Sequence, residues 1–190
     1  MMDLKVIFII AFTYIYAFFE IYMSFRQRGK RTIIKSDDRW SIWILIISIT
    51  IGYTLSFGIG ITKTGRLHHW NTFFIIGAML TMIGLIIRIN SILTLKQHFT
   101  YTVTEIKSHE IIETGLYKYI RHPGYLGQLI IFLGISTSLA NWLSVLLMIL
   151  SVLIGYTYRI SIEERFMKQQ MGQKYIDYQK RTKRLIPFIY

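Results

Sequence analysis

The chain has 190 residues, of which 53% are hydrophobic, and it carries a formal net charge of +12 and no cysteine. This length allows one domain, and the lack of cysteine excludes disulfides, thiolate metal sites and cysteine nucleophiles. The apolar residues gather in runs long enough to cross a hydrocarbon layer of about 30 Å. The composition therefore predicts an integral membrane protein.

Five apolar runs predict about five transmembrane helices in an all-α bundle. The first run is expected to be a retained span. Asp3 disturbs the basic start that a signal peptide needs, and the run is longer than the apolar core of one. In chain order the runs are Leu4–Phe25, Trp40–Ile61, Trp70–Leu95, Pro123–Leu139 and Trp142–Tyr158.

The last two helices are predicted to form a tight antiparallel hairpin, because only Ala140 and Asn141 separate them. Pro123 suits the first turn of the fourth helix, where its missing N–H costs nothing. This helix is at the low end of spanning length, and a re-entrant hairpin is the alternative. The charged tail, Arg159–Tyr190, is predicted to continue the fifth helix, to break at Gly172 and to form a cytoplasmic C-terminal helix.

Lys and Arg residues are concentrated on one side of the predicted spans. Six follow the first span, four precede the fourth span and eight lie in the tail, whereas the opposite side has only Lys5, Lys63 and Arg66. The positive-inside rule then puts the N-terminus outside and the C-terminus and any active site in the cytoplasm, as in a bacterial plasma membrane. The same distribution argues against nucleic-acid binding, which would need a basic face on a soluble domain.

Glycine pairs recur seven residues apart in two of the predicted spans. Gly77 and Gly84 share one helix face in the third span, and Gly127 and Gly134 do so in the fourth. Small residues let membrane helices approach closely. The pairs therefore predict close packing at these positions and no catalytic role.

Two groups of residues stand out as candidates for chemistry. The corner Arg121-His122-Pro123 holds two cationic side chains at the start of the fourth helix, because Pro123 keeps His122 out of the helical conformation. A catalytic corner and ordinary interfacial cations are equally compatible with these residue types. Arg159 and Glu163 share one face of the fifth helix, and Glu164 lies beside them. Carboxylates near lipid tend to be functional and can bind an ammonium group.

Other charged residues have less definite roles. Glu20, in the first span, is expected to pair with Arg26 or Arg28, and Arg88 is expected to reach the cytoplasmic interface or to pair with Glu20 or Glu163. The three histidines that might bind a metal, together with Glu110, match no zinc spacing, so no metal site is expected. They are His98, His109 and His122.

The stretch from Arg88 to Pro187 resembles the isoprenylcysteine carboxyl methyltransferase family and, more loosely, the membrane phospholipid methyltransferases. The matching pieces keep the family's order and spacing. They are Arg88 with Phe99-Thr100; Val103; His109 to Tyr117; Arg121-His122-Pro123 with Tyr125 and Gly127; Arg159 with Glu163-Glu164; and Gly172, Tyr175, Tyr178, Arg184 and Pro187. The chain departs from the family at Lys96, where a small residue is common.

The resemblance implies S-adenosyl-L-methionine as the cofactor, bound by the loop after the third span and the last two helices. The adenosine part would be lined by His109, Ile112 and Tyr117. The sulfonium and carboxylate region would be framed by Arg121, His122 and Tyr125. The amino group would be held by Glu163 and Glu164. At the acceptor, the implied catalytic residues are Arg159, which would orient a carboxylate, and its partner Glu163.

The whole chain, 1–190, is accordingly expected to be a single membrane methyltransferase domain. Residues 1–95 would form the acceptor side, and residues 96–190 the cofactor-binding half. The acceptor would be a lipophilic small molecule or lipid carrying a carboxylate or hydroxyl. A phospholipid amine N-methyltransferase, a nicotinamide-dependent reductase and a non-catalytic transport or interaction protein are the alternatives.

Overall fold

The structure, a computed structural model, describes residues 3–28, 40–95 and 111–186. Within these ranges the regular structure is helical, with a single short 3-10 turn between α3 and α4. The elements are α1 (Leu4–Arg28), α2 (Ser41–Gly60), α3 (Trp70–Leu95), η2 (Gly115–Lys118), α4 (Pro123–Ser138), α5 (Trp142–Met171) and α6 (Gln173–Arg181). The predicted all-α class and the predicted helices agree with these bounds.

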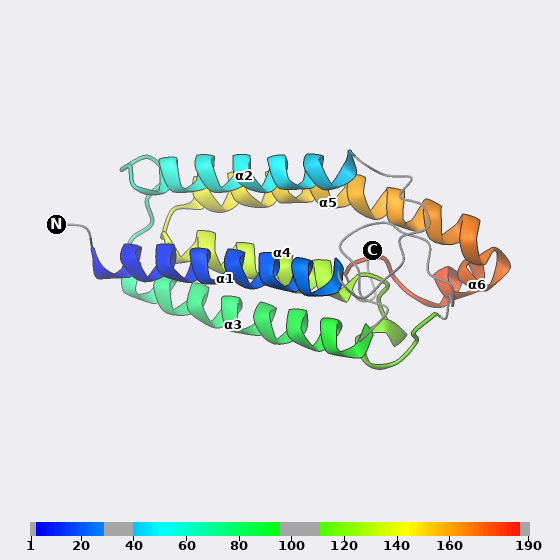
Figure 1. The fold of residues 1–190 in the computed structure, drawn as a ribbon. Coiled ribbons are helices and arrows are strands. Elements are labelled where there is room, and N and C mark those ends of the chain that lie inside the picture. Colours follow the sequence, from blue (N-terminus) through cyan, green and yellow to red (C-terminus); the bar gives the residue numbers. More distant parts are fainter. Residues whose placement is uncertain (1–2, 29–39, 96–110, 187–190) are drawn as a thin grey trace.

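Helices α1 to α5 lie side by side in one bundle, and α6 packs beyond one end of it (Figure 1). Two helix pairs make up the centre, since α3 packs along α4 and α2 packs along α5, while the α4–α5 hairpin joins the two pairs. Helix α1 lies along the outside of the bundle. The chain thus crosses the bundle repeatedly and brings the C-terminal end of α3, the start of α4 and the end of α5 to the same end.

Four of the helices are long and apolar enough to cross a membrane: α1, α2, α3 and α5. The fourth predicted span is present as α4, but its 16 residues reach only about 24 Å. Helix α5 continues without a break for 30 residues, and Gly172 ends it with a φ of 55°, at the position where the sequence predicts a break. Its last turns therefore project past the start of α4.

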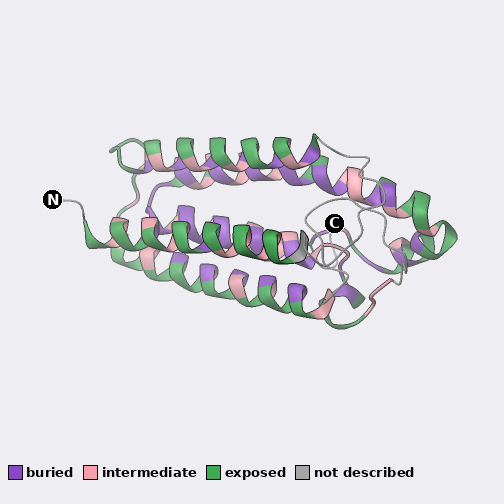
Figure 2. Cartoon of the chain, viewed as in Figure 1, coloured by how far each residue is buried: buried purple, intermediate pink, exposed green. Residues whose placement is uncertain are grey.

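The side-chain distribution is the reverse of that in a water-soluble bundle. Helix α2 buries mainly small residues against α5, among them Ser48, Gly52 and Ser56, and exposes large apolar residues such as Trp43 and Ile47. Figure 2 shows exposed residues along the outer faces of the helices. In lipid the large side chains contact acyl chains, and small residues allow the backbones to approach. This pattern supports an integral membrane protein.

Helices α3 and α4 meet through the two glycine pairs that the sequence singles out. A Cβ atom added at Gly84 would lie 2.6 Å from the Gly127 carbonyl oxygen, and one added at Gly134 would lie 2.5 Å from the Gly77 carbonyl oxygen. Backbone contacts this short leave no room for any side chain. The prediction of close packing is confirmed.

The hairpin between α4 and α5 turns at Ala140, whose φ is 50°. Asn141 then caps α5, because its Oδ1 atom accepts from the N–H groups of Leu143 and Ser144 at 3.0 and 3.2 Å. Its Nδ2 group donates to the Thr64 carbonyl at 2.7 Å. One side chain therefore fixes the hairpin to the α2–α3 connection and sets the register of the two helix pairs.

Replacing Gly134 by Ala should destabilise the bundle by about 1–3 kcal/mol, the usual penalty for overpacking. Gly58 is the matched control, since a Cβ atom there meets nothing within 4 Å. Gly58→Ala should leave stability unchanged or raise it slightly, because Ala favours a helix over Gly. Thermal unfolding in detergent micelles measures both, and equal midpoints for the two variants would contradict the packing.

Candidate functional site

Polar side chains converge at the end of the bundle where α4 begins. Pro123 is the first residue of α4, and His122 before it adopts φ −124° and ψ 55°, outside the helical region as the sequence predicts. A proline at this position removes a backbone donor that has no partner within the helix. The chain therefore turns sharply here and aims the side chains of Arg121 and His122 toward α5.

The backbone of this corner is held by the segment that follows α6. The Arg121 N–H donates to the Lys183 carbonyl at 2.8 Å, the His122 N–H donates to the Arg184 carbonyl at 3.1 Å, and the Lys183 N–H donates to Tyr119 at 2.9 Å. The two segments are far apart in the sequence. These backbone hydrogen bonds hold the corner in place independently of its side chains.

Glu164 is the centre of a buried cluster of opposite charges. Its carboxylate, which is 4% exposed, accepts from Arg121 Nε at 2.7 Å and from Arg184 Nη2 at 2.9 Å. His122 Nε2 lies 3.3 Å away. Arg121 also donates to the Thr182 carbonyl. Glu164 thus ties α5 both to the α4 corner and to the C-terminal segment.

Glu163 forms a second set of contacts on the neighbouring face of α5. Its carboxylate accepts from Arg159 Nε at 2.9 Å and from the Tyr125 hydroxyl at 2.6 Å. His122 Nδ1 lies 3.7 Å from it. Glu163 remains 21% exposed, whereas Arg159 is 1% exposed and also donates to the Ser41 hydroxyl at the start of α2. His122 therefore sits between two carboxylates that have different environments.

Tyr117, in η2, is buried, and its hydroxyl lies 3.5 Å from the Ser91 carbonyl of α3. Its carbonyl accepts from the Tyr178 hydroxyl at 2.7 Å, which links η2 to α6. Burial raises the pKa of both the Tyr117 and Tyr178 hydroxyls well above the usual range, so both remain protonated donors. Ile112 is half-buried in the segment before η2. His109 and Lys96 lie outside the described residues.

A further ion pair lies deeper in the bundle. Arg88 of α3 donates through Nε and Nη2 to the two carboxylate oxygens of Glu20 at 2.9 and 2.8 Å. The Tyr16 hydroxyl also donates to Glu20, at 2.6 Å. Arg88 thus pairs with Glu20, one of the partners that the sequence offered for it, and Glu20 has a cationic partner on another helix. The sequence favoured Arg26 or Arg28 for Glu20, and the Arg28 side chain lies outside the described part of the chain.

Most of the residues singled out from the sequence come together, and several partners were missed. Arg121, His122, Tyr125, Arg159, Glu163 and Glu164 form one connected cluster. The cluster also includes Ser41 and Thr182, and the neighbouring Glu20–Arg88 pair includes Tyr16. The types of these residues do not indicate such contacts.

The cluster combines the groups that a ligand carrying both charges would need. A partly exposed carboxylate, an imidazole and a tyrosine hydroxyl lie within a few ångströms of one another, with guanidinium groups behind them. In the described part of the chain, His, Asp and Glu side chains form no group of three suited to a metal ion. The arrangement suits a zwitterionic organic ligand, for which one acidic and one cationic partner are needed.

Comparison with known proteins places these residues in a family. A family model described as phospholipid methyltransferase matches residues 72–174, which include Arg88, the α4 corner and both glutamates. Protein-S-isoprenylcysteine O-methyltransferase B of Arabidopsis thaliana is 31% identical over 124 residues, which are 64% of this chain and 62% of the plant protein. The corresponding protein of Schizosaccharomyces pombe is 32% identical over 109 residues, 56% of this chain and 46% of its own length.

A solved structure shows the same fold. It is that of the eukaryotic intramembrane Ras methyltransferase, isoprenylcysteine carboxyl methyltransferase, with a TM-score of 0.59 and 26% identity over 82% of this chain and 55% of that one. The resemblance predicted from the sequence motifs is confirmed. The chain spans about three fifths or less of the length of these curated relatives.

Replacing Glu164 by Gln should destabilise the protein by about 3–5 kcal/mol, because Arg121 and Arg184 would lose the buried carboxylate that faces them both. Asp177→Asn is the control, since Asp177 pairs with Lys180 on the exposed face of α6, where ion pairs contribute little. Unfolding of both variants in detergent should show a large loss for the first and almost none for the second. Similar small losses would mean that Glu164 does not hold the C-terminal segment.

Proposed function

The chain belongs to the phospholipid methyltransferase family, and we propose that it is an integral membrane methyltransferase that uses S-adenosyl-L-methionine to methylate a lipophilic acceptor. The observation that carries this proposal is the buried cluster around Glu163 and Glu164, which lies within the region that the family model matches. Its groups lie at the end of the bundle where α4 begins and where α5 continues past the other helices. A donor from the aqueous phase and an acceptor from the bilayer can both reach this place.

In this proposal Glu163 holds the ammonium group of the cofactor. It is the more exposed of the two glutamates, and a carboxylate that faces an ammonium forms a strong charge-assisted contact. Glu164, whose oxygens already accept from Arg121 and Arg184, acts on the cofactor by holding Arg121 and His122 in place. Those two side chains and Tyr125 would frame the carboxylate and sulfonium region.

The adenosine part of the cofactor would lie beside Tyr117 and Ile112. Both residues precede the α4 corner, and the Tyr117 backbone is fixed to α6 by the Tyr178 hydroxyl. An apolar surface made by a buried tyrosine and a half-buried isoleucine, next to charged groups, matches a cofactor with a nucleoside at one end and a charged amino acid at the other. His109, which the family resemblance also assigns to the adenosine part, would approach from the preceding segment.

The proposed acceptor is a lipophilic carboxylate, as the names of the curated relatives suggest for those proteins. The cofactor supplies an electrophilic methyl group when it is bound. A carboxylate is already anionic, so the protein needs no strong base. Its residues bind the two reactants in line and exclude water. Residues 1–95 would contribute the acceptor side, and residues 96–190 the cofactor half.

Arg159, which the resemblance assigns to the acceptor, acts in this proposal as a positioning residue. Its buried guanidinium donates to Glu163 and to Ser41, so it sets the orientation of Glu163. We further propose that the N-terminus faces outward and that the site faces the cytoplasm. The support is the excess of Lys and Arg in the segments on the site's side of the bundle.

N-methylation of a phospholipid amine is the second candidate, and the description of the matching family model favours it. Purified protein in lipid nanodiscs, supplied with cofactor labelled in the methyl group, separates the two. Incubation with N-acetyl-S-farnesylcysteine should give a methyl ester whose label is released by base. Label that resists base and migrates with phosphatidylethanolamine derivatives would support the amine reaction. No transfer to either acceptor or to a bacterial lipid extract would reject the proposed function.

Replacing Glu163 by Ala should weaken binding of S-adenosylhomocysteine by about 10- to 100-fold, the effect of losing a contact with a charged group worth roughly 1.5–3 kcal/mol. Calorimetry in detergent measures this, with Asp177→Asn as the control that keeps wild-type affinity. Wild-type affinity in the Glu163 variant would remove this residue from the cofactor site.

Replacing Arg159 by Ala should lower turnover more than it weakens cofactor binding. The Tyr125 hydroxyl still holds Glu163 for the ammonium group, whereas a small rotation of Glu163 would misplace the methyl group for in-line transfer. The loss of turnover should be about tenfold or more, the size expected when a reacting group is misplaced. Turnover under saturating substrates and binding of S-adenosylhomocysteine give the two numbers. Equal losses in both would assign Arg159 to cofactor binding, and unchanged turnover would remove it from the mechanism.

A further inference from the structure

The ion pair between Glu20 and Arg88 has the geometry of a carboxylate-binding site. The two guanidinium nitrogens Nε and Nη2 of Arg88 each donate to a different oxygen of Glu20, at 2.9 and 2.8 Å. Such a two-pronged contact is the arrangement in which Arg recognises planar carboxylates. The Arg88 side chain is 5% exposed and that of Glu20 is 15% exposed, so water is largely excluded from the pair.

Arg88 lies directly next to the candidate active site. A Cβ atom added at Gly124 would be 2.8 Å from Arg88 Nη1, so the guanidinium lies against the first turn of α4, just after the Arg121–Pro123 corner. A side chain at position 124 would collide with it. Tyr117, which we assign to the cofactor side, also interacts electrostatically with Arg88. A ligand held by Arg88 would therefore lie close to the proposed methyl donor.

The polar surroundings of Arg88 continue toward Glu163. The Tyr156 hydroxyl donates to Gln128 at 3.0 Å and interacts electrostatically with both Arg88 and Glu20. The Tyr156 ring packs on the Tyr125 ring, with 4.9 Å between their centroids, and Tyr125 donates to Glu163. Two tyrosines thus connect the Arg88 pair to the proposed ammonium site.

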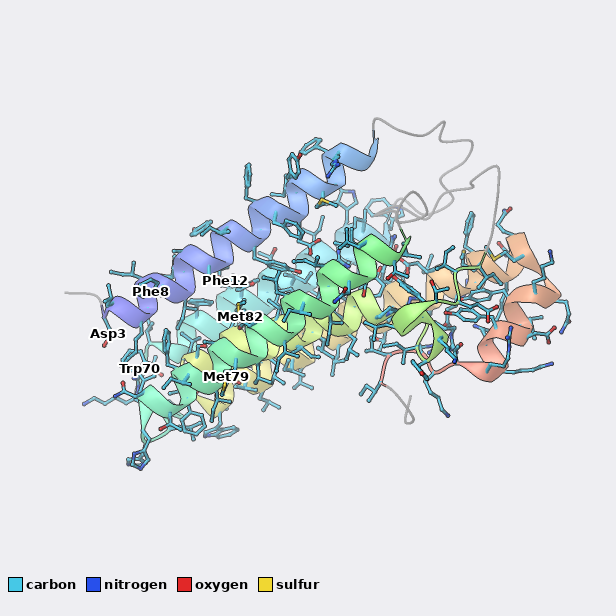
Figure 3. The ribbon with its side chains drawn as sticks, turned by 90° about the horizontal axis from the view of Figure 1, so that it is seen from below. Asp3, Phe8, Phe12, Trp70, Met79 and Met82 are labelled. Atoms are coloured by element: carbon cyan, nitrogen blue, oxygen red, sulfur yellow. The ribbon has the colours of Figure 1, made fainter. Side chains whose placement is uncertain are left out.

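The helix that supplies Glu20 is the one least embedded in the bundle. Of the α1 side chains that the structure describes, Ile9 and Tyr16 are the buried ones. Helix α1 lies apart along one edge of the bundle in Figure 3, where Phe8 and Phe12 mark its course. Its polar ties to α3 are the Glu20–Arg88 pair near one end and the Lys5–Asn71 contact, beside Trp70, near the other. A carboxylate on such a helix can withdraw at little expense in packing.

We propose that Arg88 is the binding site for the carboxylate of the methyl acceptor, and that Glu20 occupies this site when no acceptor is bound. This inference rests on the proposed function for the identity of the acceptor. The entering carboxylate takes the place of the Glu20 carboxylate on the Arg88 guanidinium, and Glu20 moves away with α1. The exchange keeps one anion on Arg88 throughout, so a buried guanidinium is never left without a partner.

Competition by Glu20 lowers the apparent affinity for the acceptor, because part of the acceptor's binding free energy is used to displace the Glu20 carboxylate from Arg88. Removing the charge of Glu20 should therefore strengthen acceptor binding. A purely structural ion pair would have the opposite property, since its loss would loosen α1 and weaken or leave unchanged the binding of a lipophilic ligand. The two interpretations therefore predict different changes in acceptor affinity when the charge of Glu20 is removed.

The experiment compares binding of N-acetyl-S-farnesylcysteine with binding of its methyl ester to purified protein in nanodiscs, without cofactor. Wild type should prefer the free carboxylate. Glu20→Gln should strengthen binding of the carboxylate by about five- to tenfold, a size typical of coupled equilibria, and leave the ester unchanged. Lys5→Met is the matched control, because it removes the other polar tie of α1 and should not change the preference.

Arg88→Lys should weaken carboxylate binding, since an ammonium cannot make the two-pronged contact. Because a single change at Arg88 removes the cation that faces Glu20 and can destabilise the fold, the double variant Glu20→Gln with Arg88→Gln tests the same point without a buried charge. It should bind the carboxylate and the ester equally. A wild-type preference in the double variant, or weaker or unchanged carboxylate binding by Glu20→Gln, would overturn the proposal.

This readout does not depend on methyl transfer. Transfer to the carboxylate without any effect of Glu20 or Arg88 on binding would leave the proposed function intact and reject the inference. Binding of the carboxylate that depends on Arg88, without any methyl transfer, would support the inference and reject the proposed function.

Discussion

Two adjacent carboxylates in a largely apolar structure set the geometry of the whole candidate site. Glu163 and Glu164 are consecutive on α5, so their side chains leave the helix about 100° apart and meet different neighbours. Glu164 draws in the α4 corner and the C-terminal segment through Arg121, His122 and Arg184. Glu163 draws in α4 through Tyr125 and, by way of Arg159, the start of α2. A buried anion without such partners would be prohibitively unfavourable, so the charges organise the segments around them.

The membrane-spanning part of the bundle supplies the close approach that this site needs. Glycines at the α3–α4 crossing bring the two backbones into contact, and this contact carries Arg88 to the first turn of α4. The α4–α5 hairpin, fixed by Asn141, places Glu163 opposite Tyr125. Packing in the lipid-facing region and polar chemistry at its end are therefore parts of one arrangement, in which small residues determine where the charged ones meet.

The helices could be predicted from the sequence because their signals are local. Apolar runs gave the spans, Ala140 and Asn141 gave the hairpin, and Gly172 marked the end of α5. The residues of the cluster were also identifiable, through their charge, their helical spacing and the family motifs. The Arg159–Glu163 pair, four residues apart on one helix, was predicted, but most contacts between distant segments were not. Whether Glu20 meets Arg26 or Arg88, and which glutamate receives Arg121, depends on contacts between distant segments, which no periodicity or spacing records. The contact of Arg159 with Ser41 was hidden for the same reason.

The central claim is that Glu163, with the His122 and Tyr125 side chains beside it, receives the amino acid part of a sulfonium methyl donor. The most direct test is an experimental structure of the protein with S-adenosylhomocysteine in nanodiscs. The account predicts density with the ligand's ammonium in hydrogen-bonding contact with Glu163 and its adenosine beside Tyr117 and Ile112. Ligand bound elsewhere, with the contacts of Glu163 unchanged, would contradict it.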